Sequence, residues 1–212
     1  SEAQSAPRTD RLVPLVRIVG GTFKGRRLVA PEGRDVRPTS DRVRESVFNI
    51  LEHAAFSPAL TDASVIDVFA GTGALGLEAL SRGATSVTFI EHDDRSRASI
   101  LKNAGALGKA RAIHVLRLDA TKLPPPPRAA NCPATLAFLD APYDQEISGP
   151  TLLSLKARGW IGPDSLCVVE TASKTEFEIP LGFEVLNQRK YGAAQISFVK
   201  IADKKPPSTA TE

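Results

Sequence analysis

The sequence predicts a doubly wound α/β fold, with a mostly parallel sheet of seven strands, helices on both faces and a terminal antiparallel hairpin. Two observations support this prediction. From residue 64 onward, β-branched and apolar runs alternate with segments of helical periodicity, and the first run ends in the glycine-rich turn 71–76. Alternating strands and helices build parallel sheets. The last two apolar runs, 183–189 and 193–201, are close enough in the chain to pair as a hairpin.

The chain has 212 residues, enough for one such domain with a small appendage. Its charge is unevenly distributed along the sequence. The net charge is only +3 and the pI is near 9.0. A local cationic patch favours a polyanionic partner, with an ordinary solvated surface as the alternative. The basic residues between positions 17 and 44 are Arg17, Lys24, Arg26, Arg27, Arg34, Arg37, Arg42 and Arg44, against Glu32, Asp35 and Asp41.

Cysteine usage and hydropathy exclude several classes of protein. Cys132 and Cys167 lie far apart, without the spacing of metal ligands, so we expect neither a disulfide framework nor a metal site. No apolar segment approaches the length of a membrane span, and the first residues are polar. We therefore expect a cytoplasmic protein that does not contact a membrane.

The first ordered segment, residues 16–31, predicts two short strands around Gly20-Gly21, the second with alternating basic and apolar side chains. A two-stranded ribbon is only marginally stable alone, so it must pack on the main domain. Its exposed Lys24, Arg26 and Arg27 would suit an RNA backbone.

A helix is expected next, because Thr39 or Ser40 followed by Asp41 is typical of a helix start. Its apolar stripe is Val43, Val47, Phe48, Ile50 and Leu51, and its other face is expected to carry Arg42 and Arg44. We accordingly predict a tail over 1–14, a basic RNA-binding extension over 15–55, the main domain over 56–202 and a tail over 203–212.

The turn after the first strand of the main domain predicts a nucleotide-like ligand. Gly71 and Gly73 can take positive φ, and the helix that follows directs N–H groups toward the turn. The letters satisfy the dinucleotide pattern G-x-G-x-x-G, with Glu91 about 20 residues after the first glycine. Asp67 lies just before the turn, and its carboxylate suits a cofactor with a positive charge or an amino group better than it suits a pyrophosphate. A plain strand-to-helix turn is the remaining alternative.

The remaining elements follow in alternation. Carboxylates stand at the ends of three predicted strands, so Glu91, Asp119 and Asp140 should share one edge of the sheet with the glycine-rich turn. The prolines at 124–127 predict an extended connection. The strands are 86–91, 112–120, 135–139 and 165–170, and the helices are 75–80, 95–107 and 152–157.

The segment Asp140-Ala141-Pro142-Tyr143 carries the predicted chemistry. The segment is similar to a motif of methyltransferases that act on an exocyclic or amide nitrogen, which is a poor nucleophile because its lone pair is delocalised. The Asp140 carboxylate and the Ala141 carbonyl could accept hydrogen bonds from both its N–H groups and free that lone pair. Pro142 would stiffen the turn and Tyr143 would stack on the target base. A simple turn is the alternative for such a segment.

Asp67-x-Phe69-x-Gly71-x-Gly73 resembles the first motif of the class I S-adenosylmethionine-dependent methyltransferases. The segment 140–143 is similar to the (Asp/Asn)-Pro-Pro-(Tyr/Phe/Trp) motif of amino-nitrogen methyltransferases, with Ala141 in place of the first proline. Together with segments 17–28 and 37–51, these motifs closely resemble the bacterial 16S ribosomal RNA guanine-N2 methyltransferase family over about residues 16–201.

The resemblance implies a Rossmann-like class I methyltransferase fold with a small N-terminal ribbon and helix, and S-adenosylmethionine as cofactor. The acceptor would be a guanine amino group of 16S rRNA, in the small ribosomal subunit or a late assembly intermediate, and the enzyme would be a monomer. In this reading Glu91 meets ribose hydroxyls and Asp119 the adenine amino group. The open alternatives are an amino nitrogen of DNA, a protein amide, a nicotinamide-dependent dehydrogenase and a non-catalytic RNA-binding module.

The predicted site residues fall into three groups. Catalysis is assigned to Asp140, Ala141, Pro142 and Tyr143. RNA contacts are assigned to Arg17, Lys24, Arg26, Arg27, Arg37 and Arg42. Cofactor contacts are assigned to Asp67, Phe69, Ala70, Gly71, Thr72, Gly73, Glu91, His92, Asp119, Ala120 and Asp140.

Overall fold

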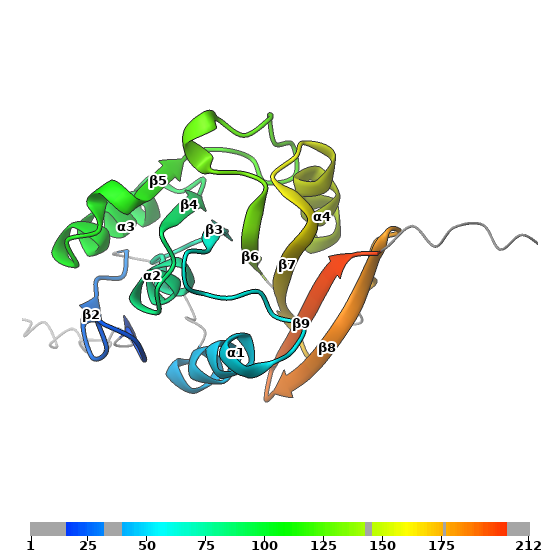
Figure 1. The fold of residues 1–212 in the computed structure, drawn as a ribbon, viewed down its shortest axis with the longest axis horizontal. Coiled ribbons are helices and arrows are strands. Elements are labelled where there is room, and N and C mark those ends of the chain that lie inside the picture. The colour runs from blue at the N-terminus through cyan, green and yellow to red at the C-terminus, as the bar shows by residue number, and fades with distance from the viewer. Residues whose placement is uncertain (1–15, 32–39, 143–145, 176, 203–212) are drawn as a thin grey trace, which may run out of the picture.

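The sheet of the computed structural model has seven strands in the order β5-β4-β3-β6-β7-β9-β8. The structure describes residues 16–31, 40–142, 146–175 and 177–202. Strands β3 to β7 run parallel, and β9 pairs antiparallel with both β7 and β8, which confirms the predicted fold class (Figure 1). The bounds are β3 Ser64–Val68, β4 Ser86–Ile90, β5 Ile113–Leu116, β6 Ala134–Asp140, β7 Ile161–Ala172, β8 Phe183–Tyr191 and β9 Ala194–Ile201.

The strand order reverses between β3 and β6. The chain passes from β3 through β4 to β5 on one side, and then returns to place β6 and β7 on the other side of β3. In open α/β sheets, ligands bind at the carboxyl ends of the strands where the order reverses. This topology therefore predicts a ligand site at the segments that follow β3 and β6.

In the described residues four α-helices connect the strands, and two of them begin at a side-chain cap. Helix α1 (Asp41–His53) starts at Ser40, whose hydroxyl oxygen accepts from the Val43 N–H at 3.2 Å. Helix α3 (Asp94–Ala106) starts at Asp93, which accepts from the Ser96 N–H at 2.8 Å. The other two helices are α2 (Ala74–Ser81) and α4 (Ser148–Ala157). Helix α4 begins earlier than predicted, because Pro150 is tolerated in a first turn.

The connection between β5 and β6 differs in part from the prediction. A 3₁₀ turn over Ala110–Ala112 replaces the start of the expected strand, and the chain leaves the sheet after Leu116. Asp119 therefore lies beyond the strand end. Residues 124–127 form neither helix nor strand, as predicted, and the Trp160 Nε1–H donates to the Pro124 carbonyl at 2.7 Å. A second 3₁₀ turn, Arg128–Ala130, leads into β6.

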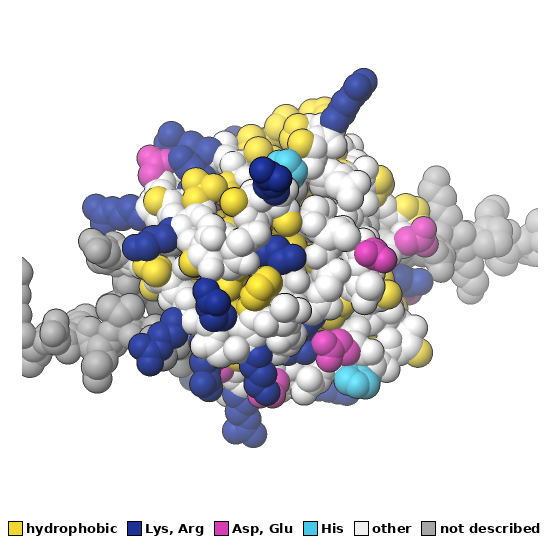
Figure 2. Space-filling model, turned by 60° about the vertical axis from the view of Figure 1, so that its left-hand side comes forward, with side chains coloured by type: hydrophobic (Ala, Val, Ile, Leu, Met, Phe, Trp, Pro, Cys, Tyr) yellow, Lys and Arg dark blue, Asp and Glu magenta, His cyan; other side chains and the backbone are white. Residues whose placement is uncertain are grey.

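The N-terminal ribbon is shorter than predicted. Its strands are β1 (Val16–Arg17) and β2 (Arg27–Leu28), and the segment 18–26 between them folds irregularly against helix α2. The predicted pair of strands around Gly20-Gly21 is confirmed, and tertiary contacts shape the segment between them. Gly21 has φ +69°, any Cβ there would overlap the Ser81 carbonyl, and the Thr22 N–H donates to that carbonyl at 2.7 Å. The ribbon does pack on the main domain. Figure 2 shows Lys and Arg side chains gathered over this side of the molecule.

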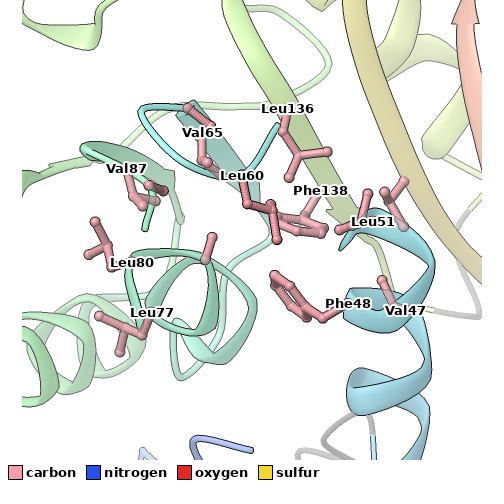
Figure 3. Packing of buried hydrophobic residues seen from close by; sticks show 14 of the residues in the cluster. Val47, Phe48, Leu51, Leu60, Val65, Leu77, Leu80, Val87, Leu136 and Phe138 are labelled. Carbon is pink, nitrogen blue, oxygen red and sulfur yellow. The ribbon is translucent and has the colours of Figure 1, made fainter. Parts of the chain in front are cut away.

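Helix α1 packs on the sheet through a continuous hydrophobic core. Figure 3 shows Val47, Phe48 and Leu51 pointing toward Leu136 and Phe138 of β6. The Phe48 and Phe138 ring centroids are 5.6 Å apart. The opposite face of the sheet has its own core, in which Trp160 is fully buried beside Leu152 and Leu155 of α4. The division of the chain at residue 55 remains a prediction.

Arg44 is buried rather than displayed on the outer face of α1, so that expectation is wrong. Its side chain is 1% exposed, and its guanidinium donates to Asp41 Oδ1 at 2.9 Å and to the Arg17 carbonyl. Its Nε lies 4.0 Å from Glu78 Oε2 on α2. Arg42, in contrast, is exposed.

In the described part of the chain, we find no helix with the length and hydropathy that a bilayer crossing requires.

Candidate active site

A cavity of about 990 Å³ opens at the carboxyl ends of the parallel strands. It brings together the turn after β3, the end of β4, the segment after β5 and the end of β6. Tyr143 and Arg37 lie outside the described residues. The predicted site residues that line the cavity are Asp67, Phe69, Ala70, Gly71, Thr72, Glu91, His92, Asp119, Ala120, Asp140, Ala141 and Pro142.

Gly73 is placed differently from the other residues of the turn. It is the N-cap of α2 with φ +77°, and a Cβ there would meet Ile100 at 3.1 Å and Phe89 at 3.2 Å. Gly73 thus allows the helix to approach its neighbours closely, and it is not among the residues that line the cavity.

The conformation of the turn after β3 depends on two residues with positive φ and on a hydrogen bond to Glu91. Phe69 has φ +61° and Gly71 has φ +55°, values that are strained for phenylalanine and unstrained for glycine. A Cβ at Gly71 would meet nothing within 4 Å. The Gly71 N–H donates to Glu91 Oε2 at 2.9 Å, and the Asp93 N–H donates to Glu91 Oε1 at 2.8 Å. Since a carboxylate has about four acceptor sites, Glu91 keeps capacity for ribose hydroxyls.

Asp67 is a buried carboxyl group behind the turn. It is 1% exposed, and its Oδ2 accepts from the Gly76 N–H in the first turn of α2 at 2.9 Å. This N–H was expected to face the ligand, but it is taken up inside the protein. Burial raises the pKa of Asp67 well above its ordinary value, the Gly76 hydrogen bond opposes this shift, and the carboxylates of Asp140 and Glu91 add to it. A cationic ligand in the cavity would favour the ionised form.

Asp67→Asn should change how stability depends on pH. Because the pKa of Asp67 is raised, the folded state holds a proton that the unfolded state has lost, from the ordinary pKa up to the raised one. Wild-type stability should therefore fall as pH rises through that window, by at most about 1.4 kcal/mol per pH unit for this group. In the Asp67→Asn variant, this dependence of the unfolding free energy on pH should be lost. Urea unfolding at several pH values, without cofactor, measures it.

The control for this experiment is Asp119→Asn. Asp119 is largely exposed and its pKa is lowered, so it titrates below the window and its replacement should leave the slope intact. Parallel wild-type and Asp67→Asn curves across the window would show that burial of Asp67 does not control this titration.

Asp119 stands at the mouth of the cavity. Its Oδ1 accepts from the Thr121 hydroxyl at 2.7 Å and from the Thr121 N–H at 2.9 Å. These hydrogen bonds lower the pKa of Asp119. A carboxylate that stays ionised here can accept a hydrogen bond from an amino group, and the buried Ala120 lies beside it.

The lining of the cavity also includes residues that the sequence analysis did not identify. Glu170 follows the same rule as Asp140, since it is an acid near the carboxyl end of a parallel strand, and this signal could have identified it. Tyr191 has no local signal, because only the folding of the β8–β9 hairpin brings it to α1, where its hydroxyl lies 2.6 Å from the Ser46 hydroxyl. The unpredicted lining residues include Ser40, Val43, Arg44, Glu170, Tyr191, Ala193 and Ala194.

The residues present fit S-adenosylmethionine. The cavity is lined by several carboxylates, among them Asp67, Glu91 and Asp140, which suits a ligand that carries a sulfonium and an ammonium group. The open side of Gly71 leaves room for a ligand against the backbone. The volume of about 990 Å³ is at the upper end for small-molecule sites, so a nucleotide-sized cofactor leaves space for an acceptor.

Known proteins with similar sequence and structure share this arrangement of elements. Residues 16–200 match the protein family described as "Conserved hypothetical protein 95". The chain is 38% identical over 160 residues to "Ribosomal RNA small subunit methyltransferase D" of Escherichia coli (strain K12), covering 74% of each chain. It is 34% identical over 182 residues to the protein of the same name from Haemophilus influenzae, covering 84% of this chain and 89% of the relative.

A solved structure supports the same relationship. The solved structure "Putative methyltransferase yhhF from Escherichia coli" superposes with a TM-score of 0.72 at 32% identity, covering 88% of this chain and 98% of the other. The match of the family over nearly all described residues, together with the class I fold and the cavity, leads to one conclusion. The chain belongs to the family "Conserved hypothetical protein 95", a family of S-adenosylmethionine-dependent methyltransferases.

Proposed function

We propose that this protein transfers a methyl group from S-adenosylmethionine to the exocyclic N2 of a guanine in 16S rRNA. It would act in the cytoplasm as a monomer, on the small ribosomal subunit or a late assembly intermediate. The observation that carries the proposal is that the glycine-rich turn and Asp140 line one cavity. The names of the relatives and the sequence resemblance support rRNA as the polymer.

The chain's own residues supply orientation rather than a strong base. When bound, S-adenosylmethionine supplies an electrophilic methyl group on its sulfonium. Asp140 and the Ala141 carbonyl accept the two N2 hydrogens and favour the geometry in which the nitrogen lone pair is free. Held against Gly71 and Glu91, the cofactor would supply the methyl group to N2, and one N2 proton would be released to solvent. Positioning for this in-line displacement accounts for most of the acceleration.

The exposed basic residues of the extension support RNA binding. Arg17, Lys24, Arg26, Arg27 and Arg42 are all exposed, and the face drawn in Figure 2 shows many basic and few acidic side chains. Arg17 pairs with Asp41 at 2.7 Å, and Arg26 donates to the Ala106 carbonyl at 2.9 Å. Lys24 and Arg27 are therefore the stronger candidates for phosphate contacts.

Replacing Lys24, Arg26 and Arg27 together by alanine should weaken RNA binding. Each lost phosphate contact should reduce the slope of log affinity against log salt by about 0.7 to 0.9, so the variant should bind with a shallower slope. The cofactor Kd should stay unchanged, because none of the three lines the cavity. Filter binding at several salt concentrations and calorimetric titration of the cofactor measure the two effects.

The control for the triple variant is Arg128→Ala with Lys174→Ala, which removes two exposed charges outside the extension. We expect a smaller change in RNA affinity for this control. If the triple variant instead loses cofactor affinity and keeps RNA affinity, these ribbon residues have a structural role.

The proposed function is tested with radiolabelled S-adenosylmethionine and small ribosomal subunits that lack the modification. The expected product, after digestion to nucleosides, is labelled N2-methylguanosine from 16S rRNA. DNA and protein substrates are incubated in parallel. Label in a DNA base or a protein amide, or no label in rRNA while the cofactor binds, would contradict the proposal.

A further inference from the structure

A second carboxylate, that of Glu170, lines the cavity on the strand next to Asp140. Glu170 of β7 is in direct register with Asp140 of β6. It is 7% exposed and it lines the cavity. On the other side of Glu170, the residue in register on β9 is Ile196, an apolar residue. The polar neighbour of Glu170 across the sheet is therefore Asp140.

The strand alternation directs both carboxylates to the same face of the sheet. Side chains two residues apart point to one face, and Leu166 and Val168 on β7 belong to the core under α1, as do Leu136 and Phe138 on β6. Glu170 and Asp140 continue these two rows toward the cavity. Neighbouring strands lie about 4.8 Å apart, so the two side chains can converge on adjacent atoms of one base.

The chemistry of guanine matches two adjacent acceptors. The N1–H and the 2-amino group are neighbouring donors on its Watson–Crick edge, whereas adenine has a bare N1 and no 2-amino group. Proteins that read unpaired bases use hydrogen bonds to this edge. With N2 held at Asp140 for methyl transfer, the next donor along the base is N1–H, and the next carboxylate in register along the sheet is Glu170.

We propose that Glu170 selects guanine by accepting a hydrogen bond from its N1–H while Asp140 and Ala141 hold the 2-amino group. This inference rests on the proposed function and deepens it, because it names the residue that distinguishes guanine from other purines. Since Glu170 contacts the base and not the methyl donor, its replacement should change substrate preference and leave cofactor binding intact.

The test compares two acceptor bases. The guanine that wild type methylates is first mapped, and 16S rRNA with either guanine or 2,6-diaminopurine at that position is prepared by ligation and reconstituted into small subunits. 2,6-Diaminopurine keeps the 2-amino group, but its N1 carries a lone pair in place of a hydrogen. Wild type should therefore prefer guanine by about a hundredfold or more in kcat/KM.

Glu170→Gln should reduce this preference at least about tenfold, because its amide can also donate to the bare N1 of 2,6-diaminopurine. Activity on guanine should fall about tenfold to a hundredfold, with cofactor Kd and thermal unfolding unchanged. The matched control is Glu184→Gln, which neutralises an exposed carboxylate paired with Lys200 on β8 and β9. It should keep the wild-type preference.

Two results would overturn the inference. A Glu170→Gln variant with the wild-type ratio of guanine to 2,6-diaminopurine activity, whatever its absolute rate, would show that Glu170 does not contact N1. Failure of wild type to methylate any rRNA guanine would overturn the proposed function as well, and this outcome is already visible in the mapping step.

Discussion

Asp140→Ala should lower kcat/KM for methyl transfer by about a thousandfold, the effect of losing one well-placed electrostatic contact to the reacting group. The variant removes the carboxylate that accepts the N2 hydrogens, whereas Asn, which the related motif also uses at this position, would keep an acceptor oxygen. The turn at Gly71 and the carboxylate of Glu91 are untouched, so the cofactor Kd should change by less than about tenfold.

Single-turnover kinetics with labelled cofactor and calorimetric titration separate these two quantities. Glu184→Gln serves as the control, since it neutralises an exposed carboxylate that does not line the cavity and should be fully active. If Asp140→Ala retains the wild-type rate, or if it loses cofactor binding in proportion to activity, Asp140 does not hold the acceptor nitrogen.

Glu78→Ala should destabilise the protein by about 3 to 5 kcal/mol, the usual cost of removing one partner from a buried ion pair. Glu78 is fully buried on α2. Its carboxylate accepts from the Val19 N–H at 2.8 Å, the Gly20 N–H at 2.7 Å and Arg82 Nε at 2.8 Å. Without it, Arg82 keeps Glu52 but loses the acceptor of its Nε–H, two backbone donors lose their acceptor, and Arg44 loses a nearby charge.

Urea unfolding measures the loss in stability. Asp94→Ala is the matched control, since it breaks an ion pair whose carboxylate is 68% exposed, and such pairs contribute about 0 to 1 kcal/mol. Because Glu78 binds the ribbon backbone at Val19 and Gly20, RNA affinity should fall along with stability. A Glu78→Ala variant as stable as the Asp94→Ala control would show that this network does not hold the ribbon in place.

The carboxylates of the cavity could be predicted from the sequence because one topological rule places them. Parallel strands end at a common edge, so acids that follow an apolar run come together without any knowledge of packing. Asp67, Glu91, Asp119 and Asp140 all line the cavity as that rule predicts. Glu170 obeys it as well, although the sequence interpretation did not use it.

Arg44 shows where prediction from sequence fails. Helical periodicity places it on the polar face of α1, and its burial depends on partners distant in the chain, the Arg17 carbonyl and Glu78. The same holds for the ribbon, whose path depends on hydrogen bonds from Thr22 and Phe23 to Ser81 at the end of α2. Tyr191 reaches the cavity only because the terminal hairpin returns to α1.

The most direct test of this account is a crystal structure of the protein with bound S-adenosylmethionine. The account predicts that the cofactor lies against Gly71, with its ribose at Glu91 and its methyl group pointing toward Asp140. Space for an acceptor nitrogen should remain about 3 to 3.5 Å from the methyl carbon. A cofactor bound elsewhere, or a methyl group directed away from Asp140, would contradict it.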